Sequence, residues 1–368
     1  EDLGRSVLLR CFCEGDAADL AVAECAGAYR ALTIALRGDP SAVVAAVSAS
    51  RLRGRGGAGF PCATKLATVR DAPSAEGTRA VVVNADEGDA GAYIDKELLE
   101  RAPHTVIEGT LLAALAVGAT EGWVYLRGEY PHAHDIFGRA VQIARDAGWL
   151  GDSVGGTGWP FDLRIVRGHG ASVCGEETSL LRSIEGVPAQ VSPKPPYPAV
   201  SGLRGAPTLV QNVETLANLP FIVGHGGEAF AALGHGNSRG TKLVSLNAAV
   251  VRPGLYEVEL GTTLRQVIFD LAGGVGGGLA FKAVQVGGPL GGIFGERHLD
   301  LPLDFDVLAE AGGLLGHGGL VVFTEADDMV AVGRGLMHFS AVESCGKCFP
   351  CRLGTQRGTE LFDRILLG

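Results

Sequence analysis

Three cysteines stand close together near the end of the chain, at Cys345, Cys348 and Cys351. This Cys-x-x-Cys-x-x-Cys spacing delivers three thiolates within one or two turns, which suits three corners of a cubane iron–sulfur cluster. Zinc sites more often use two separated Cys-x-x-Cys pairs, and a redox dithiol needs only two cysteines. The spacing therefore favours an iron–sulfur cluster over structural zinc. The remaining cysteines lack ligand spacing as a group, and we interpret them as ordinary cysteines: Cys11, Cys13, Cys25, Cys62 and Cys174.

A second candidate site is a glycine-rich loop that Lys65 follows closely. Its residues are Gly54, Arg55, Gly56, Gly57, Ala58, Gly59 and Phe60. So bare a backbone can approach a flat or phosphorylated ligand, and its N–H groups can hold an anion. No predicted strand precedes the loop, so it is not the Rossmann dinucleotide fingerprint. A flexible turn is the alternative interpretation.

Two acidic segments each follow a predicted strand. The first is Asn84–Asp89, and the second is 168–178, which contains Glu176 and Glu177. Ligands of α/β sheets bind at the carboxyl ends of the strands, so these side chains could bond ribityl hydroxyls, flavin nitrogens or a nicotinamide amide. Acids are also favourable at the start of a helix without any ligand, which is the alternative.

A proline-rich stretch at 193–198 predicts a stiff, polyproline-like segment that holds Lys194 and Tyr197 in fixed directions. A cation and an aromatic ring presented in this way suit the phosphates and the adenine of a dinucleotide. A rigid linker is the alternative.

Composition narrows the classes of protein. The 368 residues are 46% hydrophobic and 20% charged, which indicates a packed globular protein, and a net charge of −10 argues against a nucleic-acid partner.

The most apolar stretch, 110–126, contains Glu121 and is shorter than the ~20 residues that a bilayer requires, so we predict no membrane insertion. The clustered cysteines and the lack of a signal pattern predict a reducing, cytoplasmic location. The chain begins at Glu1 and not at Met, so we expect it to be part of a longer product.

The predicted elements alternate in type. We expect helices at 27–32, 41–50, 106–118 and 134–147, and strands at 80–83, 123–126 and 162–166. This alternation predicts an α/β layer with parallel strands. A hairpin (242–246 and 255–258), a helix (263–271) and strands at 283–286 and 319–323 then predict a small β-grasp-like unit. From 327 the chain is predicted to be helical on both sides of the cysteines.

Taken together, six segments in this order resemble the NADH-binding flavoprotein subunit of respiratory complex I and of its soluble relatives. They are 54–61, 84–87, 174–178, 194–198, 211–215 and 343–352. The resemblance implies a Rossmann-like FMN- and NAD-binding α/β domain at 1–238, an SLBB-type β-grasp domain at 239–325, and a helical bundle at 326–368 that holds a [4Fe–4S] cluster.

The resemblance also implies roles for single residues. The glycine loop with Phe60 lies under flavin and nicotinamide, and Lys65 belongs to the same site. Contacts to FMN come from Asn84, Asp86, Glu87, Gly175, Glu176 and Asn212. Glu177 and Asp89 orient the nicotinamide, which makes them the predicted catalytic pair, and Lys194 and Tyr197 hold the outer half of the dinucleotide. The cysteine triplet binds the cluster, with its fourth ligand expected outside residues 1–368.

Two segments favour one branch of this family. The run 287–292 and the segment 354–365 look most like β subunits of soluble NAD-dependent molybdenum formate dehydrogenases. The implied function is a diaphorase that exchanges hydride between NAD(H) and FMN and single electrons between FMN and the [4Fe–4S] cluster. The implied partners are a small [2Fe–2S] subunit and a catalytic molybdenum or hydrogenase subunit. Alternatives are an NAD-reducing hydrogenase diaphorase, a complex I subunit, or a non-redox SLBB binding module with structural zinc.

Gln211 departs from the family's Asn-Asn pair, which could retune dinucleotide binding.

Overall fold

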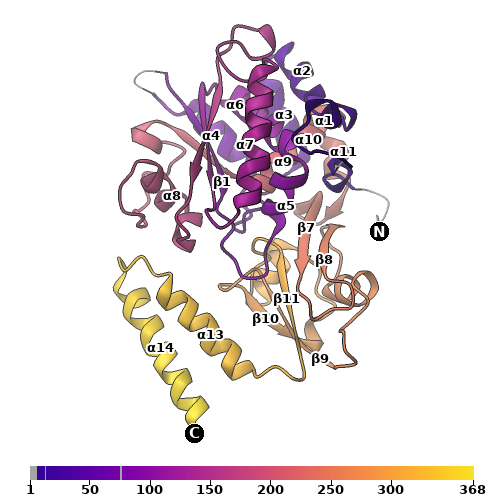
Figure 1. The fold of residues 1–368 in the computed structure, drawn as a ribbon, viewed down its shortest axis with the longest axis vertical. Helices are drawn as coiled ribbons and strands as arrows, with labels where there is room; N and C mark the ends of the chain where they lie inside the picture. Colours follow the sequence, from indigo (N-terminus) through magenta and orange to yellow (C-terminus); the bar gives the residue numbers. More distant parts are fainter. Residues whose placement is uncertain (1–5, 13, 75–76) are drawn as a thin grey trace.

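The computed structural model describes residues 6–12, 14–74 and 77–368, and a four-stranded parallel sheet lies at the centre of its larger part (Figure 1). The strands run in the order β3-β2-β1-β4, all parallel. They are β1 (Ala80–Ala85), β2 (Glu121–Leu126), β3 (Asp162–Arg167) and β4 (Thr208–Asn212). The inner strands are almost continuously apolar because helices cover both faces of the sheet.

Alternate side chains of β1 enter two different cores. Val81 and Val83 join the main core, which contains α6 (Pro103–Val117) and α7 (Pro131–Asp146). Val82 faces the opposite side and joins a smaller core with α8 (Glu177–Ile184). The period-two alternation of a strand produces this division. Helix α6 is buried along nearly its whole length, which explains why its sequence is apolar all round.

Short helices complete this part of the chain. They are α1 (Leu20–Cys25), α2 (Arg30–Leu36), α3 (Ser41–Ser50), α4 (Cys62–Asp71), α5 (Ile94–Arg101), α9 (Val213–Ala217), α10 (Leu219–His225) and α11 (Gly227–Ala231). The glycine-rich loop connects α3 to α4, and the loop after β1 leads into α5.

A second, five-stranded sheet has the order β10-β9-β11-β7-β8. Its strands are β7 (Thr241–Leu246), β8 (Gly254–Glu259), β9 (Phe281–Val286), β10 (Gly292–Gly295) and β11 (Gly319–Thr324), and a two-stranded ribbon, β5 (Gly234–His235) with β6 (Ser238–Arg239), precedes them. Strands β7 and β8 form the predicted antiparallel hairpin, and β11 runs parallel to β7. Together with α12 (Phe305–Glu310) this sheet encloses a core of its own.

Two antiparallel helices end the chain, α13 (Met329–Val342) and α14 (Phe349–Leu367). Figure 1 shows them packed against each other, with the turn between them directed toward α8. The cysteine triplet lies in this turn and at the start of α14. Within the described part of the chain, we find no helix that is both long and apolar enough to span a bilayer.

The structure corrects two of the predicted elements. The helix expected at 263–271 is present but begins at Leu264, because Thr263 forms a β-bridge with Pro302, and it is π-helical over Gln266–Leu271. The proline-rich stretch bends at 194–196 and is not a regular polyproline segment. Its Lys194–Pro195 and Pro195–Pro196 peptide bonds are cis. Strands β4 and β10 were not predicted as strands.

Candidate functional site

A cavity of about 490 Å³ lies where the carboxyl ends of β1 and β4 meet the glycine-rich loop and the turn before β11. It extends to the cysteine turn between α13 and α14. The residues that line it include Gly56, Asn84, Asp86, Glu87, Asp89, Asp95, Ser172, Gly175, Glu176, Asn212, Leu290, His317, Glu343, Cys345, Cys348 and Cys351. Segments far apart in the sequence, most of them predicted as sites, therefore share one cavity, and Asp95 and His317 join them without having been predicted.

The glycine-rich loop borders this cavity because its glycines permit close contacts. A Cβ atom on Gly56 would lie 2.9 Å from the Cβ of Asn212. Gly57 forms an antiparallel bridge with Gly316, which joins the loop to the turn before β11. Gly59 has a left-handed φ of +61°, and a Cβ there would lie 2.7 Å from the ring of Phe305. The loop is therefore fixed by close packing and is not a flexible turn.

Arg55 anchors the loop from the side away from the cavity. Its fully buried guanidinium donates from Nη2 to the carbonyl of Arg239 at 2.6 Å and from Nη1 to that of Arg53 at 3.3 Å. Burial lowers the pKa of Arg55 to about 10, so the group stays charged at neutral pH. Arg55 does not line the cavity, and its backbone N–H donates to Thr215 Oγ1 at 2.8 Å. Its loop neighbours Ala58 and Phe60 are exposed.

The loop after β1 presents a carboxylate that lacks protein donors. Asn84 holds this loop against the next segment by donating from Nδ2 to the Gly175 carbonyl at 2.8 Å. Asp86 is buried, and within the described chain no donor makes a hydrogen bond to either of its carboxylate oxygens; Arg127 Nη1 is 3.9 Å away. Burial raises the pKa of Asp86 to about 7 despite the charge of Arg127. An unsatisfied carboxyl at a cavity wall fits a ligand with hydroxyl or N–H donors, such as the ribityl chain and ring of the predicted flavin.

Glu87 has a different environment, because its carboxylate caps α5. Its Oε1 accepts from the backbone N–H groups of Ile94 at 2.6 Å and Asp95 at 3.1 Å, and its Oε2 accepts from that of Lys96 at 3.1 Å. These are the orphan donors of a helix N-terminus, where a negative charge is favourable. Glu87 thus lies at the cavity while its oxygens are occupied by the protein.

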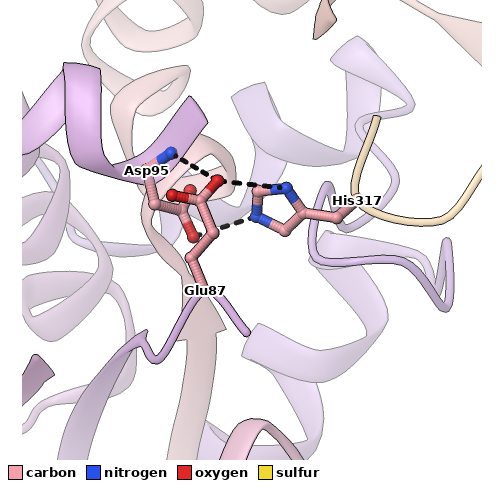
Figure 2. Close-up of side chains that lie close together, drawn as sticks. All are labelled: Glu87, Asp95 and His317. Atoms are coloured by element: carbon pink, nitrogen blue, oxygen red, sulfur yellow. Dashed lines mark hydrogen bonds and ion pairs between the residues drawn. The ribbon is translucent and has the colours of Figure 1, made fainter. Parts of the chain in front are cut away.

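His317 completes a buried cluster with Glu87 and Asp95, whose ligand-capable atoms all lie within 4.8 Å of one another (Figure 2). Its Nε2 is 3.0 Å from Asp95 Oδ2, and its Nδ1 is 3.5 Å from Glu87 Oε1. Asn212 donates from Nδ2 to the same Asp95 oxygen at 2.7 Å. We did not predict His317 as a site residue. The only local signal was its position between two glycines, Gly316 and Gly318.

The two predicted glutamates of the second acidic segment form an ion-pair network with two predicted lysines. Lys65 Nζ lies 2.9 Å from Glu177 Oε2, and Lys194 Nζ lies 3.0 Å from Glu177 Oε1 and 2.9 Å from Glu176 Oε1. Burial alone would raise the pKa of Glu177, but the two lysines lower it below its ordinary value. Glu176 also caps α8 by accepting from the N–H of Thr178 at 2.9 Å. Tyr197 is 56% exposed, so its ring is available for stacking.

The cysteine turn is attached to the wall of the cavity. Glu343 Oε2 accepts from the backbone N–H of Ser172 at 2.7 Å, and Lys347 Nζ donates to the Val191 carbonyl at 2.5 Å. Cys345 is half-buried, whereas Cys348 and Cys351 are exposed. Three thiols on one cavity wall fit a cluster that takes thiolate ligands. Cys13 lies outside the described residues.

A parallel sheet with a glycine loop and acidic segments at its carboxyl edge, next to a cysteine triplet in the same cavity, defines the class of a flavoprotein with an adjacent iron–sulfur centre. Comparison with known proteins agrees with this class. Residues 47–221 match the Nuo51 FMN-binding domain family, and residues 331–368 match the NADH-ubiquinone oxidoreductase-F iron–sulfur binding region.

Individual relatives are similar over most of the chain. It is 44% identical over 340 residues to the HndC subunit of the NADP-reducing hydrogenase of Solidesulfovibrio fructosivorans, which covers 92% of this chain and 69% of the relative. It is 41% identical to the F subunit of the NADH-quinone oxidoreductase of Aquifex aeolicus, covering 93% and 78%. A solved NAD⁺-reducing [NiFe]-hydrogenase in the H₂-reduced state aligns with a TM-score of 0.85 and 36% identity over 99% of this chain. This chain spans 58% of that hydrogenase chain.

The chain belongs to the family of NADH-quinone oxidoreductase F subunits. This membership confirms the predicted resemblance, the enzyme class of NAD-dependent oxidoreductase components, and the cofactors FMN, NAD and a [4Fe–4S] cluster. It argues against the alternative of a zinc-containing binding module. The roles of the single site residues remain predictions.

Proposed function

We propose that this chain exchanges hydride between NAD(H) and FMN and passes single electrons between FMN and a [4Fe–4S] cluster bound by Cys345, Cys348 and Cys351. One observation carries this proposal: the segment with Asn84 and Asp86 and the cysteine triplet line the same cavity. A flavin and a cluster held there are neighbours, so electrons pass between them without a diffusing carrier.

The residues that would hold FMN combine unsatisfied and pre-positioned groups. The two carboxylate oxygens of Asp86 need donors, and the bare face of Gly56 admits a ring or a chain close to the backbone. Asn84, Glu176 and Asn212 line the same walls, and their side chains are already oriented by protein hydrogen bonds. When bound, FMN supplies the conversion between two-electron hydride chemistry and one-electron transfer.

The dinucleotide site we propose lies at the edge of this cavity. Lys65 and Lys194 fix the carboxylate of Glu177, which with Asp89 orients the nicotinamide amide. Lys194 and Tyr197 contact the outer half of the dinucleotide. These residues supply positioning and not proton transfer, because hydride moves directly between rings that are held together.

For the parent assembly we propose a cytoplasmic formate dehydrogenase in which net flow runs from cluster to FMN to NAD⁺. The run 287–292 and the segment 354–365 support this branch. The partners would be a small [2Fe–2S] subunit and a molybdenum subunit. An NAD-reducing hydrogenase is the second candidate, and the solved hydrogenase neighbour favours it.

We also propose a division into three domains: a flavin domain at 1–238, an SLBB-type domain at 239–325 and a cluster domain at 326–368.

The test is co-purification of the chain with its partners. We expect flavin and iron–sulfur absorbance, NADH:ferricyanide activity, and NAD⁺ reduction that depends on formate. Reduction that depends on H₂ instead of formate would assign the chain to a hydrogenase. A colourless protein that contains zinc and no flavin would contradict the redox function itself.

A further inference from the structure

The proposed flavin cavity is strongly acidic. Its walls carry six carboxyl groups: Asp86, Glu87, Asp89, Asp95, Glu176 and Glu343. Among the described residues that line it, His317 is the only one whose side chain can carry a positive charge. FMN bears an anionic phosphate, and its ring gains negative charge when it accepts a hydride. Like charges repel, so retention of such a ligand is helped by cations that balance the carboxyls. Lys194 lies 2.9 Å from Glu176 and Arg127 lies 3.9 Å from Asp86, which leaves Glu87 and Asp95 to be balanced by His317.

Hydrogen-bond geometry indicates that Nε2 of His317 carries a hydrogen. Both His317 Nε2 and Asn212 Nδ2 face Asp95 Oδ2, at 3.0 and 2.7 Å, and the two nitrogens are 3.4 Å apart. The orientation of the Asn212 amide is fixed, because its oxygen accepts from the backbone N–H of Thr215 at 3.3 Å. Two donors therefore share one carboxylate oxygen.

The second ring nitrogen also faces a carboxylate. Nδ1 of His317 lies 3.5 Å from Glu87 Oε1, and no acceptor or donor in the described chain is closer in hydrogen-bonding geometry. A lone pair directed at a carboxylate would be repelled, whereas an N–H⁺ is attracted. Both sides of the ring therefore favour the imidazolium form.

The other charges around the ring agree with this form. Burial by itself lowers the pKa of His317, but Asp95 and Glu87 outweigh burial and the opposing charge of Lys242 from β7, and they raise the pKa to about 9. Asp89 from the loop after β1 adds a further negative charge nearby. A metal ion suits this cluster less well, because Glu87 already accepts three backbone N–H groups of α5.

His317 also connects the two sheets through its side-chain contacts. It lies in the turn before β11 of the five-stranded sheet. Its partners belong to the four-stranded sheet and its surroundings: Glu87 to the loop after β1, Asp95 to α5 and Asn212 to the end of β4. Its Asp95 partner holds the amide of Asn212, which is one of the predicted flavin contacts. The charge of His317 is thus linked to a residue of the cavity wall.

We propose that His317 is a positioning residue of the flavin site: at neutral pH it is a cation that balances Glu87 and Asp95 and thereby allows the acidic cavity to retain anionic FMN. This inference rests on the proposed function, in which the cavity holds FMN.

The experiment measures the Kd of FMN for the full chain stripped of flavin, by quenching of flavin fluorescence between about pH 6 and about pH 10, which brackets the pKa range at issue. Ionisation of Asp86 changes the Kd between about pH 6 and about pH 8, so His317 is tested above this range: the unaltered chain should bind more weakly above about pH 9 than at about pH 8. In His317→Gln we expect a Kd about tenfold higher at about pH 8, the ratio that one pKa unit of interaction represents. The weakening should also begin at lower pH, because Glu87, whose pKa is raised by burial, then ionises without a neighbouring cation.

Further variants separate charge from packing. His317→Lys retains a cation and should keep most of the affinity, with the weakening moved to higher pH. The double variant His317→Gln/Asp95→Asn removes one charge of each sign and should recover most of the loss. His225→Gln is the matched control, since His225 is exposed on α10. If His317→Gln fails to fold, the lysine and double variants decide the question.

Two outcomes overturn the inference in distinguishable ways. If the unaltered chain binds FMN, and His317→Gln binds it with the same Kd and the same pH dependence, the inference alone is wrong. If the unaltered chain does not bind FMN at any pH, the proposed function is wrong as well.

Discussion

Lys65 Nζ lies 2.9 Å from Glu177 Oε2, and this ion pair joins the helix after the glycine-rich loop to the start of α8. Lys194 approaches the other oxygen of the same carboxylate at 3.0 Å. Both oxygens of Glu177 are therefore held by cations from two separate segments, and its pKa is lowered by them. A carboxylate fixed in this way is suited to orient a bound amide and unsuited to accept a proton.

Substitution of Glu177 by Gln should impair use of the dinucleotide more than the chemistry on the flavin. The neutral amide releases both lysines, so we expect the KM for NADH to rise roughly tenfold, or about 1.4 kcal/mol of binding, with a smaller change in kcat. Steady-state NADH:ferricyanide kinetics measure both constants. Glu310→Gln, at the exposed end of α12, is the control. An unchanged KM and kcat in the Glu177 variant would contradict the orienting role.

Asp86 should make the flavin-free protein less stable as the pH rises. Its pKa in the folded chain is about 7, above the ordinary value of 3.8, so ionisation of the buried carboxyl costs stability between those two pH values. Asp86→Asn removes this cost. We expect its thermal midpoint to equal that of the unaltered chain near pH 4 and to exceed it at pH 8. The free energy of unfolding at pH 8 should rise by ~1.4 kcal/mol for each unit by which folding raises the pKa of Asp86. If the thermal midpoints of the two proteins change with pH in the same way, this account is refuted. The affinity of the variant for FMN should also fall.

Neighbouring residues were sufficient for two of the predictions. The spacing of Cys345, Cys348 and Cys351 predicted an iron–sulfur site, which agrees with the family match over 331–368, and the apolar run predicted strand β1, which the structure contains. His317 was missed because its partner Asp95 lies 222 positions away, and no local pattern reports such a pairing. The direction of the Arg55 side chain was equally hidden, since it depends on the carbonyl of Arg239 in the β5–β6 ribbon.

The attachment of the cysteine turn to the cavity wall should matter more for electron transfer to the cluster than for hydride transfer at the flavin. Glu343 accepts from the backbone N–H of Ser172, and a hydrogen bond to a charged group contributes ~1.5–3 kcal/mol. In Glu343→Ala the turn is released more often, so we expect cluster reduction by NADH to slow severalfold while NADH:ferricyanide activity is retained. Stopped-flow absorbance separates the two steps.

Glu360→Ala is the matched control for this prediction, because it removes an exposed ion pair on α14 far from the turn. Equal rates of cluster reduction in both variants would show that the Glu343 contact does not position the turn.

A methyl group on Gly288 offers a separate test of Asp89. A Cβ at this position would lie 2.4 Å from the Asp89 carboxyl group, and Gly288 has a left-handed φ of +77°. Gly277 is a matched control, since its φ of +68° carries the same backbone penalty but a Cβ there meets nothing within 4 Å. Both alanine variants should lose ~1–2 kcal/mol of stability from the strained backbone. Only Gly288→Ala must displace Asp89, so only this variant should raise the KM for NAD⁺ severalfold. If the two variants have the same KM, Asp89 does not orient the nicotinamide, and the role falls to Glu177 alone.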